Sequence, residues 1–139
     1  MNASVFQEAI KRQKISMTLW MIVAIDQIIF GVATGIIWFV LYFAVAALGI
    51  WNLHTVKITH DNINFFQKNP DNLVPYCQKR LKNYGKAMIW NIIVGLIGLT
   101  FGWLLLIFIL PAIICGIVGG IWDYNFDKYV LAHANELTN

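Results

Sequence analysis

Two long stretches almost without charge are the feature that most constrains the fold of this chain. Residues 15–53 contain one charged residue, Asp26, in 39 positions, and residues 87–122 contain none in 36. A spanning helix needs about 20 apolar residues to cross a hydrocarbon core of about 30 Å. A single helix over the first stretch would be about 58 Å long, so each stretch is expected to cross twice. We therefore predict an all-α integral membrane protein with four transmembrane helices.

The two stretches belong to a tandem repeat. Residues 5–60 align without gaps on residues 76–131 at an offset of 71, with 12 identities in 56 positions. The pairs Phe-Gly at 30–31 and 101–102, and Gly-Ile-Trp at 49–51 and 120–122, carry most of the similarity. Because each copy crosses twice, both copies face the same way. They are parallel hairpin repeats related by an axis along the membrane normal.

The middle of each stretch should hold the reversal of its hairpin. Glycine tolerates the positive φ of a tight reversal, and Gly31, Gly35 and Gly102 lie near these midpoints. This places the crossings near 15–31, 35–53, 86–102 and 104–122. Pro111 then lies inside the fourth crossing and should kink it. The alternative, a reversal at Pro111, leaves about 11 residues for the last crossing, too few to span.

The basic residues predict the orientation. Of the ten Lys and Arg, nine lie in the N-terminal segment, the connector 54–85 or the tail 123–139, Lys86 lies at the connector's boundary with the third crossing, and none lies in a hairpin turn. The positive-inside rule therefore places both termini and the connector in the cytoplasm. The whole chain, 1–139, is then one membrane domain of a plasma or inner membrane, with Trp51 and Trp122 as anchors at the cytoplasmic interface. Short basic amphipathic runs at 5–14 and 73–84 precede the hairpins and are expected along the membrane surface.

Three polar residues inside the predicted crossings are candidate site residues: Asp26, Gln27 and Asn91. An ionisable group within a membrane is costly and is a functional hypothesis by default. Three roles for Asp26 stay open: a hydrogen-bonded or interfacial structural role, a contact between helices or subunits, and a transport or proton site. The equivalent position in the second copy is Ile97. Asn91 is expected to form a hydrogen bond to a neighbouring helix.

Small residues recur on the helices of the second copy and predict close packing, because small side chains let helix backbones approach in lipid. We expect the third helix to pack on the fourth through them, with homo-oligomer formation as the alternative. The first copy has fewer glycines in its crossings and is expected to pack less closely. The small residues concerned are Gly95, Gly98, Gly102, Ala112, Gly116 and Gly120.

The basic clusters before each hairpin are explained by topology alone, and binding of anionic lipid is their alternative role. They comprise Lys11, Arg12, Lys14, Lys79, Arg80 and Lys82.

Neither the histidines nor the cysteines have the spacing of a metal site, so we predict no metal and no cofactor. No nucleophile–base pair, carboxylate pair or phosphate-binding loop is present, which argues against an enzyme. We predict no nucleic-acid partner.

Three functions remain. The first is a non-enzymatic membrane protein that acts through helix–helix contacts, as an accessory or assembly subunit, an immunity-type protein or a self-associating scaffold. The second is a small oligomeric channel or transporter with Asp26 on the pathway. The third is a membrane-shaping hairpin protein, by analogy of layout with reticulon-type proteins. The expected partners are the bilayer, anionic lipids, and either a second copy or another membrane protein.

Overall fold

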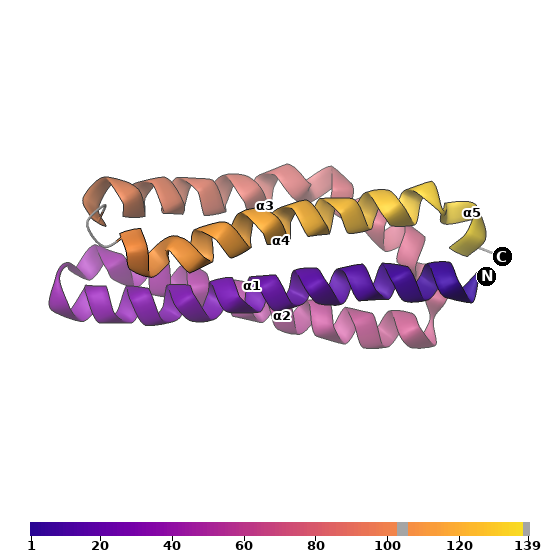
Figure 1. Ribbon diagram of the computed structural model, residues 1–139, viewed down its shortest axis with the longest axis horizontal. Helices are drawn as coiled ribbons and strands as arrows, with labels where there is room; N and C mark the ends of the chain where they lie inside the picture. The colour runs from indigo at the N-terminus through magenta and orange to yellow at the C-terminus, as the bar shows by residue number, and fades with distance from the viewer. Residues whose placement is uncertain (103–105, 138–139) are drawn as a thin grey trace.

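The structure, a computed structural model, describes residues 1–102 and 106–137, without the side chains of 83–87, 94–95, 97–102 and 106–108. Nearly all of the described chain is helical (Figure 1). Four long helices run roughly parallel to one axis, and the two termini lie at the same end (Figure 1). The elements are α1 (Ala3–Ile37), η1 (Val40–Tyr42), α2 (Phe43–Lys68), η2 (Pro70–Asn72), α3 (Leu73–Gly102), α4 (Leu106–Ala132) and α5 (Ala134–Leu137).

Within the described residues, three helical segments are long and apolar enough to cross a membrane: Ala3–Ile37, Val40–Lys68 and Ile109–Ala132. At 1.5 Å per residue α1 is about 52 Å long, which exceeds the hydrocarbon core by about 20 Å. The composition and length of these helices fit the predicted α-helical membrane protein, with part of each long helix outside the bilayer.

The first reversal lies later in the chain than predicted. α1 continues through Gly31 and Gly35, so neither glycine forms the turn and the boundary expected between the first two crossings is wrong. The chain reverses at Trp38 and Phe39, whose backbone N–H groups both donate to the carbonyl of Thr34, at 2.8 and 3.1 Å. No described residue has a positive φ. A reversal built this way does not require glycine.

The glycines of α1 and α2 instead allow these two helices to touch. Gly31 lies so close to the backbone of Ala46 that a Cβ atom there would overlap it. A Cβ on Gly49 would lie 2.8 Å from the carbonyl oxygen of Ala24, and Gly35 packs against an aromatic ring of α2. The expectation that the first copy packs loosely is therefore wrong, because a few glycines at the contact points are sufficient for close approach.

Two small residues of α4, Gly116 and Gly119, face α1. A Cβ on Gly116 would lie 3.8 Å from Val23 Cγ2, and one on Gly119 would lie 3.2 Å from Trp20 Nε1. The contact of this face with α1 was not predicted, and the predicted contact with α3 involves α3 side chains that lie outside the described part of the chain. The buried small residues of the face are Ala112, Gly119 and Gly120.

The remaining predictions for the second copy concern α3 and its connection to α4. Gly95, Gly98 and Gly102 lie outside the residues whose side-chain surroundings the structure describes. α3 ends at Gly102 and α4 begins at Leu106, which agrees with a second reversal near residue 102. Pro111 lies inside α4 as expected.

The basic runs before each hairpin are not separate surface helices. Residues 5–14 form the first turns of α1, and residues 73–84 form those of α3. Their apolar side chains pack together and on the end of α4, so they extend the bundle straight beyond its apolar part. The chain ends join there too, because the N–H of Asn2 donates to the carbonyl of Glu136 at 2.7 Å. This core comprises Val5, Ala9, Ile10, Ile63, Phe66, Leu73, Val74, Cys77, Phe126, Val130 and Leu137.

Candidate functional site

Asp123, the residue after the second Gly-Ile-Trp, is the acceptor of a polar network between three helices. Ser16 Oγ of α1 donates to Asp123 Oδ1 at 2.6 Å, and Trp20 Nε1 donates to Oδ2 at 2.9 Å. From α3, Arg80 Nη2 donates to Oδ1 at 3.1 Å. Both carboxylate oxygens are thus engaged, and the network joins α1, α3 and α4.

Arg80 extends this network to a second carboxylate. Its Nε donates to Asp127 Oδ2 at 3.1 Å, and its guanidinium lies over the rings of Tyr76 and Phe126. Asp127 is fully buried, and its Oδ1 has no hydrogen-bond partner in the described part of the chain. Burial by itself would lower the pKa of the Arg80 guanidinium, but the two carboxylates outweigh that effect and raise it. Arg80 is therefore charged at all physiological pH values.

A chain of three amides joins α1, α2 and α3. Asn52 Nδ2 donates to Gln27 Oε1 at 2.7 Å and to Asn91 Oδ1 at 3.4 Å. Two of the three predicted intramembrane polar residues, Gln27 and Asn91, therefore meet through Asn52, which sequence reasoning did not select. Asn52 is buried, and an amide in such a place requires partners because water is excluded.

One hydrogen-bonded pair of each network occupies positions that the predicted repeat alignment relates. At an offset of 71, Trp20 aligns with Asn91 and Asn52 aligns with Asp123. The α1–α4 contact pairs Trp20 with Asp123, and the α2–α3 contact pairs Asn91 with Asn52. The same two repeat positions therefore meet in both contacts between the copies, as expected for a pseudo-twofold arrangement.

A cavity of about 590 Å³ lies between α2 and α3 and reaches the side chains of all four long helices. Its size is in the range of small-molecule and peptide pockets. Trp51 and Trp90 line it and are 68% and 66% exposed, so the cavity opens sideways between the two helices. Arg80 and Asp123 form a polar part of its wall. Its apolar and aromatic lining includes Met17, Trp20, Leu48, Trp51, Val56, Ile58, Tyr76, Met88 and Trp90.

One difference between the copies accounts for this opening. In the α1–α4 contact, Gly119 lies directly against Trp20 and Leu19. The residue of α2 aligned with Gly119 is Leu48, and it lines the cavity. A leucine in place of a glycine holds two helix backbones apart. The tight contact on one side of the bundle therefore becomes an open groove on the other.

Asp26 lies away from this groove. It is half-buried, near the backbone of Ala112, and its Oδ2 has no hydrogen-bond partner among the described residues. It does not line the cavity between α2 and α3. The structure thus separates Asp26 from Gln27 and Asn91, with which the sequence had grouped it.

The predicted basic clusters divide by environment. Arg12 pairs with Glu8 at 3.0 Å and lies 4.4 Å from the Tyr129 ring centroid, and Arg80 belongs to the polar network. The other four side chains, Lys11, Lys14, Lys79 and Lys82, are exposed. Of the two predicted tryptophan anchors, Trp51 is exposed and Trp122 half-buried.

The network residues Ser16, Asp123 and Asp127 were missed as site residues, and Arg80 was predicted only as a topology signal or lipid contact. The repeat alignment held the signal, since it places an acid, Asp123, and an amide at the same exit position of the two copies. Within the described residues, no group of three or more His, Cys, Asp or Glu side chains is placed to hold a metal ion.

Comparisons with protein families, with curated proteins and with solved structures found no match for this chain.

Proposed function

We propose that this protein is a non-enzymatic polytopic membrane protein that acts through helix–helix contacts, with the groove between α2 and α3 as its docking site for a transmembrane helix of a second copy. The opening of this groove between the exposed side chains of Trp51 and Trp90 is the observation that carries the proposal.

The lining of the groove has the composition of a protein interface. Aromatic residues, Met and Arg are enriched at interface cores, and Trp, Tyr and Arg dominate hot spots. The groove contains three tryptophans, one tyrosine, two methionines and one arginine. Its polar part is already hydrogen-bonded, so it offers a shaped, largely apolar surface.

The chain itself carries a suitable occupant. The outer face of α1 presents Ile22, Ile25, Ile29 and Ile36, which are 42–73% exposed. Their spacing of three, four and seven residues places them along one side of the helix. Ile22 and Ile25 lie closest along α1 to Trp20, which lines the groove, so they are the members of this ridge at nearly the same depth in a parallel second copy.

The proposal includes the predicted topology of four crossings, with α3 as the third, both termini in the cytoplasm and two parallel hairpin repeats. The repeat relation is supported by two hydrogen-bonded pairs, Trp20–Asp123 and Asn91–Asn52, which the alignment places at the same two positions of the repeat. The position of both termini at one end of the bundle (Figure 1) is consistent with an even number of crossings.

The test is site-specific photo-crosslinking in native membranes with two differently tagged copies. A photoreactive phenylalanine analogue in place of Leu48 should give a crosslink between the two tags. The same analogue in place of Ile109, a half-buried residue of α4 away from the groove, is the control and should not. Crosslinks from Leu48 to lipid alone would contradict the proposal, and crosslinks to another protein alone would replace the second copy by a different partner.

One observation favours the channel or transporter as a second candidate: a buried carboxylate oxygen of Asp26 has no hydrogen-bond partner among the described residues. A carboxylate in that position can exchange a proton or bind a cation. In reconstituted vesicles, an ion or proton flux that is present in the wild type and lost in Asp26→Asn would support it. The absence of flux in both proteins would end it.

A further inference from the structure

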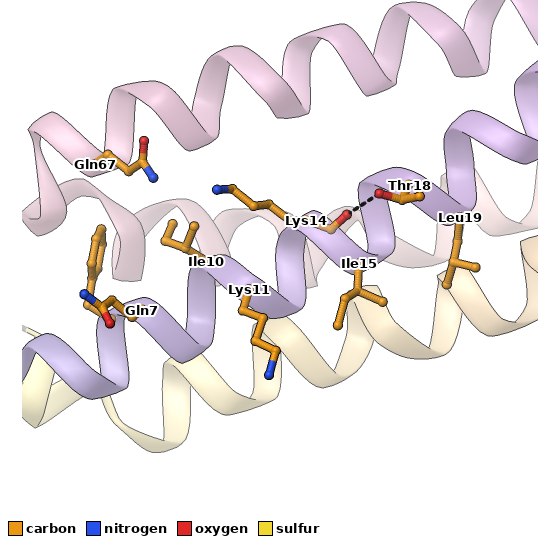
Figure 2. A pocket seen from close by; sticks show the side chains of 9 residues that line it. Gln7, Ile10, Lys11, Lys14, Ile15, Thr18, Leu19 and Gln67 are labelled. Carbon is orange, nitrogen blue, oxygen red and sulfur yellow. Dashed lines mark hydrogen bonds between the residues drawn. The ribbon is translucent and has the colours of Figure 1, made fainter.

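A second groove, of about 680 Å³, runs along α1 at the point where this helix is expected to enter the membrane. Gln7, Lys11, Lys14 and Thr18 line it, together with Gln67 of α2. The α1 residues recur at intervals of four, three and four, so they lie along one stripe of the helix. Figure 2 shows Lys14 extending toward Gln67, whereas Lys11 points to the other side of α1.

The charge of this groove is positive and uncompensated. Its lining contains Lys11 and Lys14 and no acidic residue. Neither lysine forms an ion pair in the described part of the chain, and both are exposed. The acid nearest in sequence, Glu8, is paired with Arg12. An anion on this stripe of α1 would therefore be flanked by two ammonium groups, one on each side, that form no ion pair with the described residues.

The groove changes from polar to apolar along α1. Lys11 and Lys14 precede the uncharged stretch that begins at residue 15, and Ile15 and Leu19 continue the lining in the direction of the membrane. Basic side chains at the cytoplasmic surface attract anionic lipids. A phospholipid has a negative phosphate followed by apolar acyl chains. Along α1 the groove has positive side chains followed by apolar ones, so the two match in sequence.

We propose that the groove binds one anionic phospholipid of the cytoplasmic leaflet, with its phosphate on the stripe of α1 that Lys14 and Lys11 flank from opposite sides and an acyl chain along Ile15 and Leu19. The amide of Gln67 is a further donor to the headgroup. The proposal depends on the cytoplasmic position of the N-terminus, but not on the helix docking proposed for the groove between α2 and α3.

The experiment is native mass spectrometry of the full chain in detergent, titrated with phosphatidylglycerol or with phosphatidylcholine of the same acyl chains. The wild type should bind phosphatidylglycerol about tenfold more tightly than phosphatidylcholine, since each lysine near a surface contributes a modest electrostatic attraction. Lys11→Gln with Lys14→Gln should remove most of that preference, and Lys11→Arg with Lys14→Arg should keep it.

Lys79→Gln with Lys82→Gln is the matched control, because it removes the same charge from the first turns of α3 and these lysines do not line the groove. It should change the preference less than about twofold. An equal loss in both double variants, or equal binding of the two lipids by the wild type, would overturn the proposal. Full competition by inorganic phosphate would assign the site to a soluble anion instead.

A variant that keeps both lysines tests the apolar half of the groove independently of charge. Leu19→Trp should fill it and lower phosphatidylglycerol binding, while Val32→Trp, on an exposed part of α1 beyond the groove, should not. Unchanged binding in Leu19→Trp would also overturn the proposal. Labelling of cysteines from either side of the membrane reports the position of the N-terminus, and crosslinking from Leu48 reports helix docking. A wrong prediction of the N-terminal position, or of helix docking, can therefore be distinguished from an absence of lipid binding.

Discussion

At the scale of single residues, Arg80 is the least replaceable side chain of the polar network. It is the only cation bonded to Asp123 and Asp127 among the described contacts, and Asp127 is fully buried. Two carboxylates this close are tolerable in a low-dielectric site only with a counter-charge. The ion pair therefore holds α3 on α4 at the end of the bundle where the termini meet.

Removing Arg80 should destabilise the protein strongly. We expect Arg80→Met to lower the free energy of unfolding by about 3–5 kcal/mol, because a buried carboxylate loses its partner. Lys79→Met, at the neighbouring exposed position, should change it by less than about 0.5 kcal/mol. Thermal unfolding in detergent, followed by tryptophan fluorescence, measures both. Arg80→Met combined with Asp127→Leu should recover part of the loss, and a double variant less stable than Arg80→Met would contradict this account.

Cys77 lies in the same region and should be chemically inert. It is fully buried, and burial, followed by the charge of Asp127, raises the pKa of its thiol far above the ordinary value. Because the thiolate is the reactive form, we expect a maleimide at pH 8 to label Cys77 only slowly in the folded Cys115→Ala protein, and rapidly in denaturant. Asn72→Cys in a chain without the native cysteines gives the rate for an exposed thiol. Equal rates for the two folded proteins would contradict the buried position.

At the scale of helices, α1 contacts α2 and α4 through glycines that differ in the space around them. Gly31 touches the backbone of Ala46, which cannot move aside without shifting α2. Gly116 has ordinary van der Waals space beside Val23. Gly31 was predicted to form a turn and Gly116 to lie on a packing face. In the structure both lie at helix contacts, and they differ in how much space a side chain would have there.

Alanine substitutions should reveal this difference. Gly31→Ala should destabilise the protein by about 1–3 kcal/mol through overpacking. Gly116→Ala should be neutral or stabilise it by up to about 1 kcal/mol, because alanine has the higher helix propensity. The midpoints of thermal unfolding of the two variants in the same detergent provide the comparison. Equal effects would show that Gly31 is not in contact with the backbone of α2.

At the scale of the whole molecule, the topology remains the main prediction that labelling can test. In a chain without native cysteines, Val40→Cys lies in the first reversal and Asn135→Cys in the C-terminal tail, and both positions are exposed. An impermeant maleimide should label Val40→Cys in intact cells, and Asn135→Cys only after permeabilisation. Val40 sits beside apolar neighbours, so its labelling is read against the fully denatured sample. The opposite pattern would reverse the orientation.

Much of the architecture follows from the sequence because its cause is local. A nearly uncharged run has to be helical within a membrane, since no water is present there to satisfy the backbone. Its length sets the number of crossings, and the basic residues predict the orientation. The chain is almost entirely helical as expected, and Pro111 lies within α4. The predicted repeat alignment pairs positions 52 and 123, each of which accepts or donates a hydrogen bond between helices.

The tertiary structure decided which residues share a contact. Gly31 could serve a turn or a close helix contact, and only the presence of Ala46 beside it distinguishes the two. Asp26 and Gln27 are neighbours in sequence but point to different surroundings, because successive residues of a helix are about 100° apart. Arg80 resembled a topology signal until the fold brought Asp123 and Asp127 beside it. Hydropathy and charge act along the chain, whereas packing and ion pairs depend on neighbours that only the folded bundle supplies.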